Sequence, residues 1–340
     1  MNRPQIDGIE PNQGWQLDLF RPEDAPGVTR LFRLVYGDAY PIKTFLDPER
    51  LIAENAARRT ISSVARTPKG DIVGHMAMVQ SAPSQDLYEI CSGLVAPDYR
   101  GEKLGFKLFE HLVTKVAPLF GIASLFGEPV CNNLVMQKIG AQMEFMIGAL
   151  EVDLMPAEVY AKEESAGGRV ATLLYFKIIS PKPQTIYVPR AYEDAVRFLY
   201  GGMKHECRLV LSSGVLPPEQ DTVVSAQIFD FAKVARFAVG AAGSDFAAVI
   251  EAEEKAAGRQ GAIVHQVWLQ LSWPWVAQAV DLLRSRGYFL GGVLPRWFDV
   301  DGFLMQKVLA APHWDAIQVF GERAGRILQM VKADWEETSR

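Results

Sequence analysis

The sequence contains only three cysteines in 340 residues, Cys91, Cys131 and Cys207. They are too few and too scattered to form a disulfide framework or a cysteine-based zinc site, so a reducing compartment fits the chain. The five histidines show no HExxH motif or other close pairing of metal ligands. We therefore expect no metal.

Long apolar runs are also missing. No segment approaches the roughly 20 residues of a membrane-spanning helix, and the N-terminal segment lacks the apolar core and cleavage site of a signal peptide. These absences predict a cytoplasmic protein without a membrane partner. The net charge of -5 gives no broad attraction to phosphate backbones, which argues against nucleic acid as an obligate partner.

The composition that remains is that of an ordinary globular protein, with 49% apolar and 22% charged residues. A chain of this length is expected to divide into two domains. Residues 156–168 are polar and rich in glycine, which is typical of a linker. The predicted domains are therefore residues 1–155 and 169–311, followed by a C-terminal helix within residues 312–340.

Apolar periodicity in the first half predicts a mixed α/β domain in the order β-α-β-β-β-α-β-α-β. The predicted segments are a strand at 15–20, a helix after 21–24, a hairpin at 61–66 and 71–80, a strand at 87–95, a helix from 104, a strand at 122–126, a helix at 132–139 and a strand at 141–154.

The second half repeats this pattern with little residue identity. Strands are predicted at 169–179, 184–189, 208–212, 222–228, 232–239, 262–272, 289–294 and 302–309, with helices at 192–203, 245–257, 275–286 and 314–335. An aromatic group could form core or line an acceptor pocket, and core is the better interpretation. Its members are Trp268, Trp273, Trp275, Phe289 and Trp297.

The segment from Leu94 to Gly105 carries the strongest functional signal. A strand that ends in a glycine-containing turn and continues into a helix directs unpaired backbone N–H groups and the helix dipole at one point, where phosphate binds. Gly101 and Gly105 allow close approach of an anion, and Arg100 or Lys103 would add positive charge.

This segment resembles motif A of the GNAT N-acyltransferases, whose pattern is Arg/Gln-x-x-Gly-x-Gly/Ala. Arg100 and Gly105 match the pattern, whereas Lys103 stands where the middle glycine is usual. Residues 72–77 resemble the third strand of the family and residues 138–141 the end of its last helix. The resemblance covers residues 15 to about 154 and implies a GNAT fold, with the second half as a degenerate tandem copy.

The resemblance implies acetyl-coenzyme A, or another acyl-coenzyme A, as co-substrate. Main-chain groups of Leu94 and Val95 would bind the pantetheine arm. The phosphates would bind at the loop formed by Arg100, Gly101, Glu102, Lys103, Leu104 and Gly105. Asn132 and Asn133 would either cap the following helix or contact the cofactor.

Glu89 is the candidate general base, because it occupies the position of the glutamate base in one branch of the family and its apolar surroundings would raise its pKa. The alternative is an exposed strand carboxylate. Met136 stands where many family members have a tyrosine acid, and it is expected in the core. Tyr99 or water would then supply the proton, or no acid is needed.

These observations predict an N-acyltransferase that passes an acyl group from acyl-coenzyme A directly to a primary amine, on a small molecule or a peptide. The alternative is an inactive fold that senses acyl-coenzyme A or mediates protein interactions. Lys103 and Met136 favour the alternative, and Glu89 with Arg100–Gly101 favours the enzyme. The acceptor and the oligomeric state, including a homodimer, stay open.

Overall fold

The computed structural model describes residues 9–11, 13–38, 40, 42–101, 103–157 and 168–339. The chain forms two compact units, Met1–Leu125 and Phe126–Arg340. Most of the predicted linker, residues 158–167, lies outside the described residues. The strands that flank it, β6 (Met146–Pro156) and β7 (Arg169–Ile178), are antiparallel neighbours. The predicted linker therefore connects two paired strands of the second unit.

Four antiparallel strands form the sheet of the first unit in the order β1-β2-β3-β4. Their bounds are β1 (Gln16–Leu19), β2 (Thr60–Arg66), β3 (Ile72–Val79) and β4 (Leu87–Val95), and β5 (Ser124–Gly127) spans the division between the units. The side chains of β2 and β3 are buried almost throughout, including the two serines of β2.

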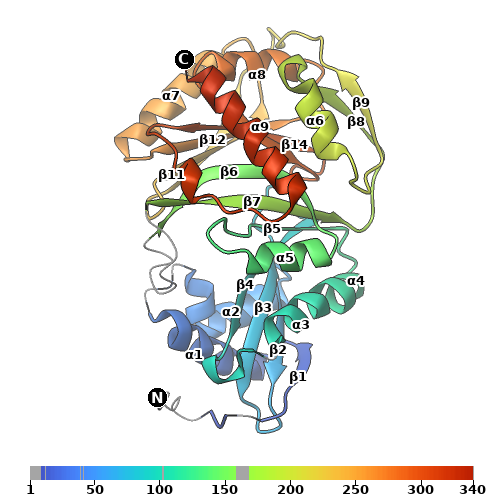
Figure 1. Cartoon of the computed structure of the whole chain (residues 1–340), viewed down its shortest axis with the longest axis vertical. Coiled ribbons are helices and arrows are strands. Elements are labelled where there is room, and N and C mark those ends of the chain that lie inside the picture. Colours follow the sequence, from blue (N-terminus) through green and yellow to red (C-terminus); the bar gives the residue numbers. More distant parts are fainter. Residues whose placement is uncertain are drawn as a thin grey trace. The chain divides into compact units, whose positions relative to one another are not determined.

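Helices cover both faces of this sheet (Figure 1). They are α1 (Ala25–Tyr36) and α2 (Pro48–Ala56) on one face, and α3 (Leu104–His111) continuing through a π-helical turn (Leu112–Val116) into α4 (Ala117–Leu119) on the other. Short 3₁₀ turns lie at Pro22–Asp24, Lys43–Leu46 and Pro97–Tyr99. Helix α2 was not predicted from the sequence.

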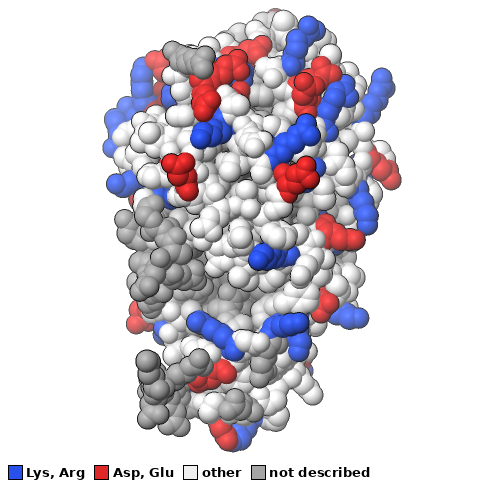
Figure 2. Space-filling model, viewed as in Figure 1, with Lys and Arg blue, Asp and Glu red and all other residues white. Residues whose placement is uncertain are grey.

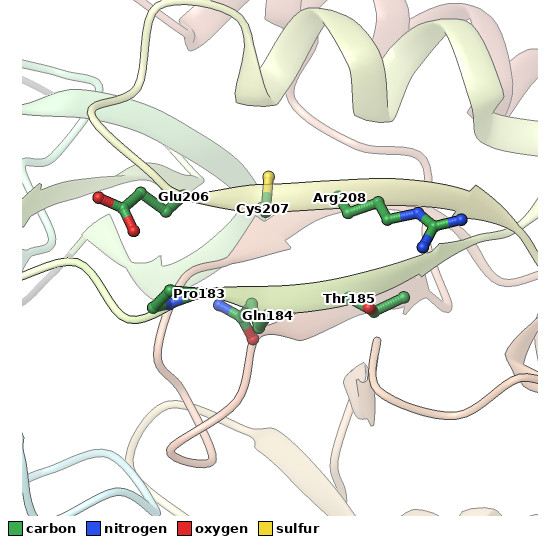
Figure 3. Close-up of a pocket in the computed structure, with 6 residues that line it drawn as sticks. All are labelled: Pro183, Gln184, Thr185, Glu206, Cys207 and Arg208. Atoms are coloured by element: carbon green, nitrogen blue, oxygen red, sulfur yellow. The ribbon is translucent and has the colours of Figure 1, made fainter.

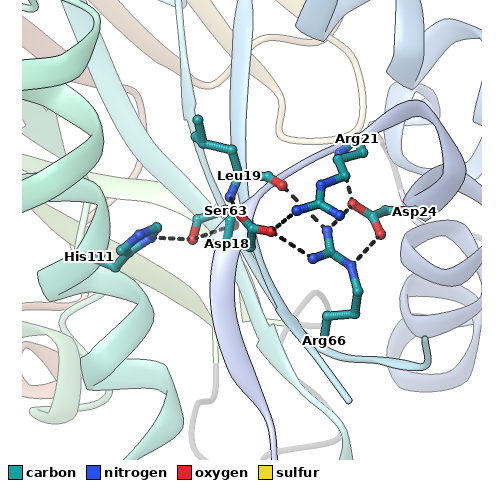
Figure 4. Close-up of polar contacts among 7 residues, drawn as sticks. All are labelled: Asp18, Leu19, Arg21, Asp24, Ser63, Arg66 and His111. Atoms are coloured by element: carbon teal, nitrogen blue, oxygen red, sulfur yellow. Dashed lines mark hydrogen bonds and ion pairs between the residues drawn. The ribbon is translucent and has the colours of Figure 1, made fainter. Parts of the chain in front are cut away.

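An ionic network fixes β1 and the start of α1 to β2 (Figure 4). The guanidinium of Arg66 donates to Asp18 at 2.8 Å and to both carboxylate oxygens of Asp24 at 2.9 and 2.6 Å. Asp24 is 5% exposed and also accepts the backbone N–H of Arg21 at 2.8 Å. The charged and backbone donors satisfy the hydrogen-bonding capacity of this buried carboxylate. A buried carboxylate without such partners would destabilise the fold.

The second unit has a mixed sheet in the order β7-β6-β13-β14-β12-β11-β10 and a separate parallel pair, β8 and β9. Neighbours are antiparallel except β11 and β12, which are parallel. The further strands are β8 (Gln184–Val188), β9 (Cys207–Leu211), β10 (Val223–Phe229), β11 (Val234–Ala241), β12 (Val264–Gln270), β13 (Phe289–Leu294) and β14 (Gly302–Val308).

Five helices of the second unit are described, and α9 crosses β13 and β6 (Figure 1). They are α5 (Val135–Gln142), α6 (Glu193–Tyr200), α7 (Phe246–Arg259), α8 (Val276–Arg284) and α9 (Glu322–Thr338), with 3₁₀ turns at Arg190–Tyr192 and Trp314–Ala316. The terminal helix begins later than predicted, because Gly321 adopts a φ of +87° directly before it.

Strands β6 and β13 meet at a glycine. Gly292 pairs with Ala149 and has a φ of +142°. A Cβ atom at position 292 would lie 2.2 Å from the carbonyl oxygen of Gly148. Only glycine therefore permits this close approach of the two strands.

The fold class predicted from the sequence, a mixed α/β protein, is confirmed. The aromatic group belongs largely to the core of the second unit, since Trp268 is 6% exposed, Phe289 is fully buried and Trp297 is 2% exposed. The rings of Trp268 and Trp297 meet edge to face at 5.0 Å. The core interpretation of these residues is therefore the correct one.

Candidate active site

Strand β4 carries Glu89 near its start and Leu94 and Val95 at its end. Glu89 pairs with Val79 and Val95 with Gly74, so the two lie at opposite ends of the β3–β4 ladder. Six residues of extended chain separate them by about 20 Å. Leu94 is buried, and the carbonyl of Val95 accepts a hydrogen bond from Nε of Arg100 at 3.3 Å.

The loop after β4 has the backbone of an anion site. Gly101 has a φ of +102°, and Lys103, directly before α3, has a φ of +59°. The side chain of Lys103, at the N-cap of α3, makes no capping hydrogen bond, and a Cβ atom on Gly101 would meet nothing within 4 Å. Uncapped N–H groups therefore lie beside a glycine with open space around it, as phosphate binding requires.

The conformation at Lys103 explains why the family pattern has glycine there. A left-handed backbone strains any residue with a Cβ atom, by about 1–2 kcal/mol, and Lys103 accepts this conformation without being glycine. A Cβ atom on Gly105 would come no closer than 4.0 Å to Val95, which fits a position where the family also accepts alanine. Leu104 is 1% exposed, so it offers an anion only its backbone. Glu102 lies outside the described residues.

A hollow of about 300 Å³ lies along β4 in the first unit, and we call it the β4 pocket. Its lining residues are Tyr40, Ile42, Thr44, Phe45, Glu54, Arg59, Thr60, Val79, Gln80, Ser81, Glu89, Cys91 and Ser92. Glu89 accepts a hydrogen bond from the Ser81 hydroxyl at 2.6 Å. The candidate base thus lines a pocket of a size that suits a small ligand.

Charge in the β4 pocket is predominantly negative. Arg59 forms a bidentate pair with Glu54, with N···O distances of 2.7 and 2.8 Å, and its charge is thereby balanced. Glu89 adds a further carboxylate. Burial raises the pKa of Tyr40 far above its usual range, against a smaller opposing effect of its hydrogen bond with Ser92, so its phenol stays neutral. The described lining thus carries two carboxylates and one guanidinium.

Tyr99 is not part of this pocket. It is 2% exposed, and its hydroxyl donates to the carbonyl of Glu10 at 2.8 Å and accepts the N–H of Gln13 at 3.2 Å. Burial raises its pKa. The hydroxyl of Tyr99 is thus engaged by the N-terminal segment, which argues against Tyr99 as the proton donor.

The asparagines and Met136 lie in the second unit. The side-chain oxygen of Asn133 accepts the backbone N–H of Val135 at 2.8 Å, and the N-cap residue of α5 is Leu134. Asn132 is 7% exposed. Met136 is 37% exposed, so the expectation that it packs in the core is wrong. It occupies the first turn of α5 beside Val135, which is also exposed.

Several pocket residues were not identified from the sequence, among them Tyr40, Ser81 and Ser92. Half of the lining residues other than Glu89 come from the chain between α1 and β2. A usable signal was present, because Asp47 before Pro48 is a strong helix start, and its side chain accepts the N–H groups of Glu49 and Arg50.

In the second half, the turn before α7 takes the same place between strand and helix as the loop before α3. This turn is filled by the chain itself. Asp245 accepts hydrogen bonds from the N–H and hydroxyl groups of Thr222 at 3.0 and 2.6 Å. A Cβ atom on Gly243 would lie 1.5 Å from the carbonyl oxygen of Gln220. A carboxylate and a neighbouring segment thus occupy the place that an anion would need.

A larger, open hollow of about 580 Å³ lies over β8 and β9 of the second unit (Figure 3). Figure 3 shows Pro183, Gln184 and Thr185 along one strand and Glu206, Cys207 and Arg208 along the other. Burial raises the pKa of Cys207 to about 11, so this thiol is not activated as a nucleophile. We assign no chemistry to this hollow.

The charge distribution on the surface and the grouping of polar side chains point to no further site in the described residues. In the view of Figure 2, basic and acidic side chains are mixed, and the described part of this face has no extensive area of one sign. Among the described residues, no three His, Cys, Asp or Glu side chains are grouped to hold a metal ion. No helix within these residues is long and apolar enough to cross a membrane.

Comparison with solved structures gives likenesses to acetyltransferases at low identity. An acetyltransferase of the GNAT family from Streptococcus pneumoniae is 18% identical, with a TM-score of 0.41 and coverage of 49% of this chain and 100% of that one. The ribosomal-protein-S18-alanine N-acetyltransferase from Escherichia coli is 18% identical, with a TM-score of 0.39 and coverage of 52% and 100%. The comparison with curated protein sequences gives no match.

The model of the acetyltransferase (GNAT) family matches residues 26–138. This range begins in α1 and ends in α5, and it includes β4, the β4 pocket's Glu89 and the whole loop before α3. Acyl transfer from coenzyme A is therefore supported at the level of the family. The chain carries a GNAT acetyltransferase domain over residues 26–138.

Proposed function

We propose that this chain is an N-acyltransferase that passes an acyl group from acyl-coenzyme A directly to a primary amine bound in the β4 pocket. The observation that carries the proposal is the uncapped N-terminus of α3, preceded by left-handed backbone at Gly101 and Lys103. This geometry suits a pyrophosphate. Arg100 and Lys103 would supply positive charge there.

The acyl donor would extend from this loop along the end of β4. Main-chain groups of Leu94 and Val95 would contact the pantetheine arm, which matches the burial of the Leu94 side chain. Arg100 now bonds the carbonyl of Val95, and its guanidinium would turn toward the phosphates when coenzyme A binds. Asn132 and Asn133 are not assigned to this contact, and the side chain of Asn133 accepts the backbone N–H of Val135.

Glu89 would accept a proton from the acceptor ammonium, directly or through water. The free amine then attacks the thioester carbon, the C–N bond forms and the C–S bond breaks. Coenzyme A leaves as a thiolate, and the second proton that the attacking nitrogen loses passes to this thiolate through water. No side chain is assigned as the acid, because the Tyr99 hydroxyl is engaged elsewhere and Met136 cannot donate a proton.

The acceptor is proposed to be a compound with a primary ammonium group, whether a small molecule or a peptide end. The carboxylate of Glu89 and the neutral Tyr40 phenol would bind the ammonium. The Tyr40 ring stacks on Tyr36 at 4.9 Å, which adds an aromatic surface for the rest of the acceptor.

The test is release of free coenzyme A thiol from acetyl-coenzyme A across a panel of primary amines. Wild type should turn over at least one amine, and Glu89→Gln should lower kcat about 100-fold or more, as loss of a general base does. Glu110→Gln, on the exposed side of α3, is the matched control and should behave as wild type. Equal activity of wild type and Glu89→Gln would remove Glu89 as the base.

A second candidate function is that of an acyl-coenzyme A sensor without catalysis. The commitment of the Tyr99 hydroxyl and the methionine at position 136 favour it. A sensor would bind coenzyme A with the same loop but release no thiol with any amine of the panel. The second half would then serve as an interaction module, and the filled turn at Thr222 and Asp245 argues against a second coenzyme A site there.

A further inference from the structure

Strand β4 is interrupted by a bulge beside the β4 pocket. On β3, His75 lies opposite Leu94, but the next pair joins Ala77 to Cys91. Two residues of β4 therefore face one residue of β3. The first of the two, Ser92, has a φ of +55°, a left-handed conformation that costs about 1–3 kcal/mol and persists only where surrounding contacts hold it.

A buried histidine of β3, His75, bonds to the backbone of this bulge. Nδ1 of His75 lies 3.0 Å from the carbonyl oxygen of Ser92, and Nε2 lies 3.1 Å from the hydroxyl of Ser62. A carbonyl only accepts, so Nδ1 carries the proton and Nε2 accepts from Ser62. The ring is fully buried and packs edge to face against Phe32 and Phe45, at centroid distances of 5.4 Å from each.

The contact continues to α2. Ser62 donates its backbone N–H to the side-chain oxygen of Asn55 at 2.9 Å, and the amide nitrogen of Asn55 lies 3.4 Å from the Ser62 hydroxyl. The same amide nitrogen donates to the carbonyl of Leu51 at 2.9 Å. One hydrogen-bonded series thus connects α2, β2, β3 and the bulge of β4 (Figure 1).

We propose that His75 is a positioning residue for acyl transfer, whose Nδ1–H group holds the Ser92 carbonyl and thereby fixes the bulge that forms part of the β4 pocket wall. This inference rests on the proposed function. Ser92 lines the pocket together with Glu89 and interacts with Tyr40. A shift of the bulge would displace the acceptor relative to the thioester.

The expected consequence is a loss of turnover without a loss of coenzyme A affinity. The phosphate loop begins at Arg100, beyond the end of β4, and none of its described residues contacts His75 through a hydrogen bond. Displacement of reacting groups by about 1 Å lowers rates up to about 100-fold. A residue that only stabilised the fold would instead change the melting temperature and leave kcat per folded molecule unchanged.

Two isosteric variants separate the contacts of the imidazole. In His75→Asn the amide nitrogen takes the place of Nδ1 and keeps the donor to Ser92. In His75→Gln the amide takes the place of Nε2, so the contact with the Ser62 hydroxyl is kept and the hydrogen bond to the Ser92 carbonyl is lost. We expect kcat within about threefold of wild type for His75→Asn and a loss of about 10- to 100-fold for His75→Gln, with the Kd of coenzyme A unchanged in both.

Equal kcat for wild type and folded His75→Gln, or an equal loss in both variants, would overturn the proposal. If His75→Gln does not fold, the imidazole ¹⁵N chemical shifts of wild type at pH 7 decide, since the proposal requires a neutral ring protonated at Nδ1. A ring protonated at Nε2 would refute it. This measurement needs no substrate, so it separates failure of the inference from failure of the proposed acyltransferase activity.

Discussion

Replacement of His75 by asparagine should flatten the dependence of stability on pH below neutrality. Burial lowers the pKa of His75 from 6.5 to about 4, against a smaller opposing effect of its bond to the Ser92 carbonyl. Between pH 4 and pH 6.5, therefore, the His75 side chain is protonated in the unfolded chain and neutral in the folded chain. Stability from this group is complete above pH 6.5 and decreases as the pH falls toward 4.

The size of the effect follows from the two pKa values. At pH 5 the difference amounts to about 2 kcal/mol, and it approaches about 3 kcal/mol at pH 4. Native-state hydrogen exchange of β3 and β4 amides, measured from pH 5 to 8, reports the opening free energy of this part of the chain. The wild-type value should fall by about 2 kcal/mol more than that of His75→Asn over this range.

His111, the other histidine of the first unit, requires a separate control. Burial lowers its pKa too, and its Nδ1 lies 2.8 Å from the hydroxyl of Ser63. The variant His111→Asn measures that contribution alone. If wild type and His75→Asn lose stability in parallel between pH 8 and pH 5, burial does not hold His75 neutral in the folded chain.

Two further substitutions test the backbone geometry. Lys103→Gly should relieve about 1 kcal/mol of left-handed backbone strain. It should also weaken coenzyme A binding roughly three- to tenfold and make the affinity less dependent on salt, which titration at two salt concentrations measures. Unchanged affinity would exclude a contact between Lys103 and phosphate. Gly292→Ala should destabilise the second unit by about 3 kcal/mol or more in urea unfolding followed by tryptophan fluorescence. The control Gly258→Ala should stabilise by about 0.5–1 kcal/mol, because there is open space around its Cβ position. Similar changes in the free energy of unfolding for both variants would contradict the close approach of β6 and β13.

Much of the fold could be predicted because the apolar pattern and the turn residues agree. Strand β13 was predicted with its observed bounds, and β4 and the start of α3 were also placed correctly. The short helix α2 was missed, although Asp47 and Pro48 mark its start, because the stretch before it contains no apolar periodicity. Local patterns thus identified the elements that bury a regular face.

The candidate site was only partly predictable, since it depends on contacts between distant residues. The loop at Arg100 to Gly105 has a local signature, and so it was found. The bulge at Ser92 has none, because the left-handed serine is held by His75 on the neighbouring strand. The hydroxyl of Tyr99 likewise bonds the segment near Glu10, far away in the sequence.

The most direct test of the account is a titration of the intact chain with coenzyme A, by calorimetry and by hydrogen exchange on the same samples. The account predicts saturable binding and protection of amides in residues 101–107 and at the end of β4. Absence of binding at millimolar coenzyme A, or protection confined to the turn at Thr222 and Asp245, would contradict it.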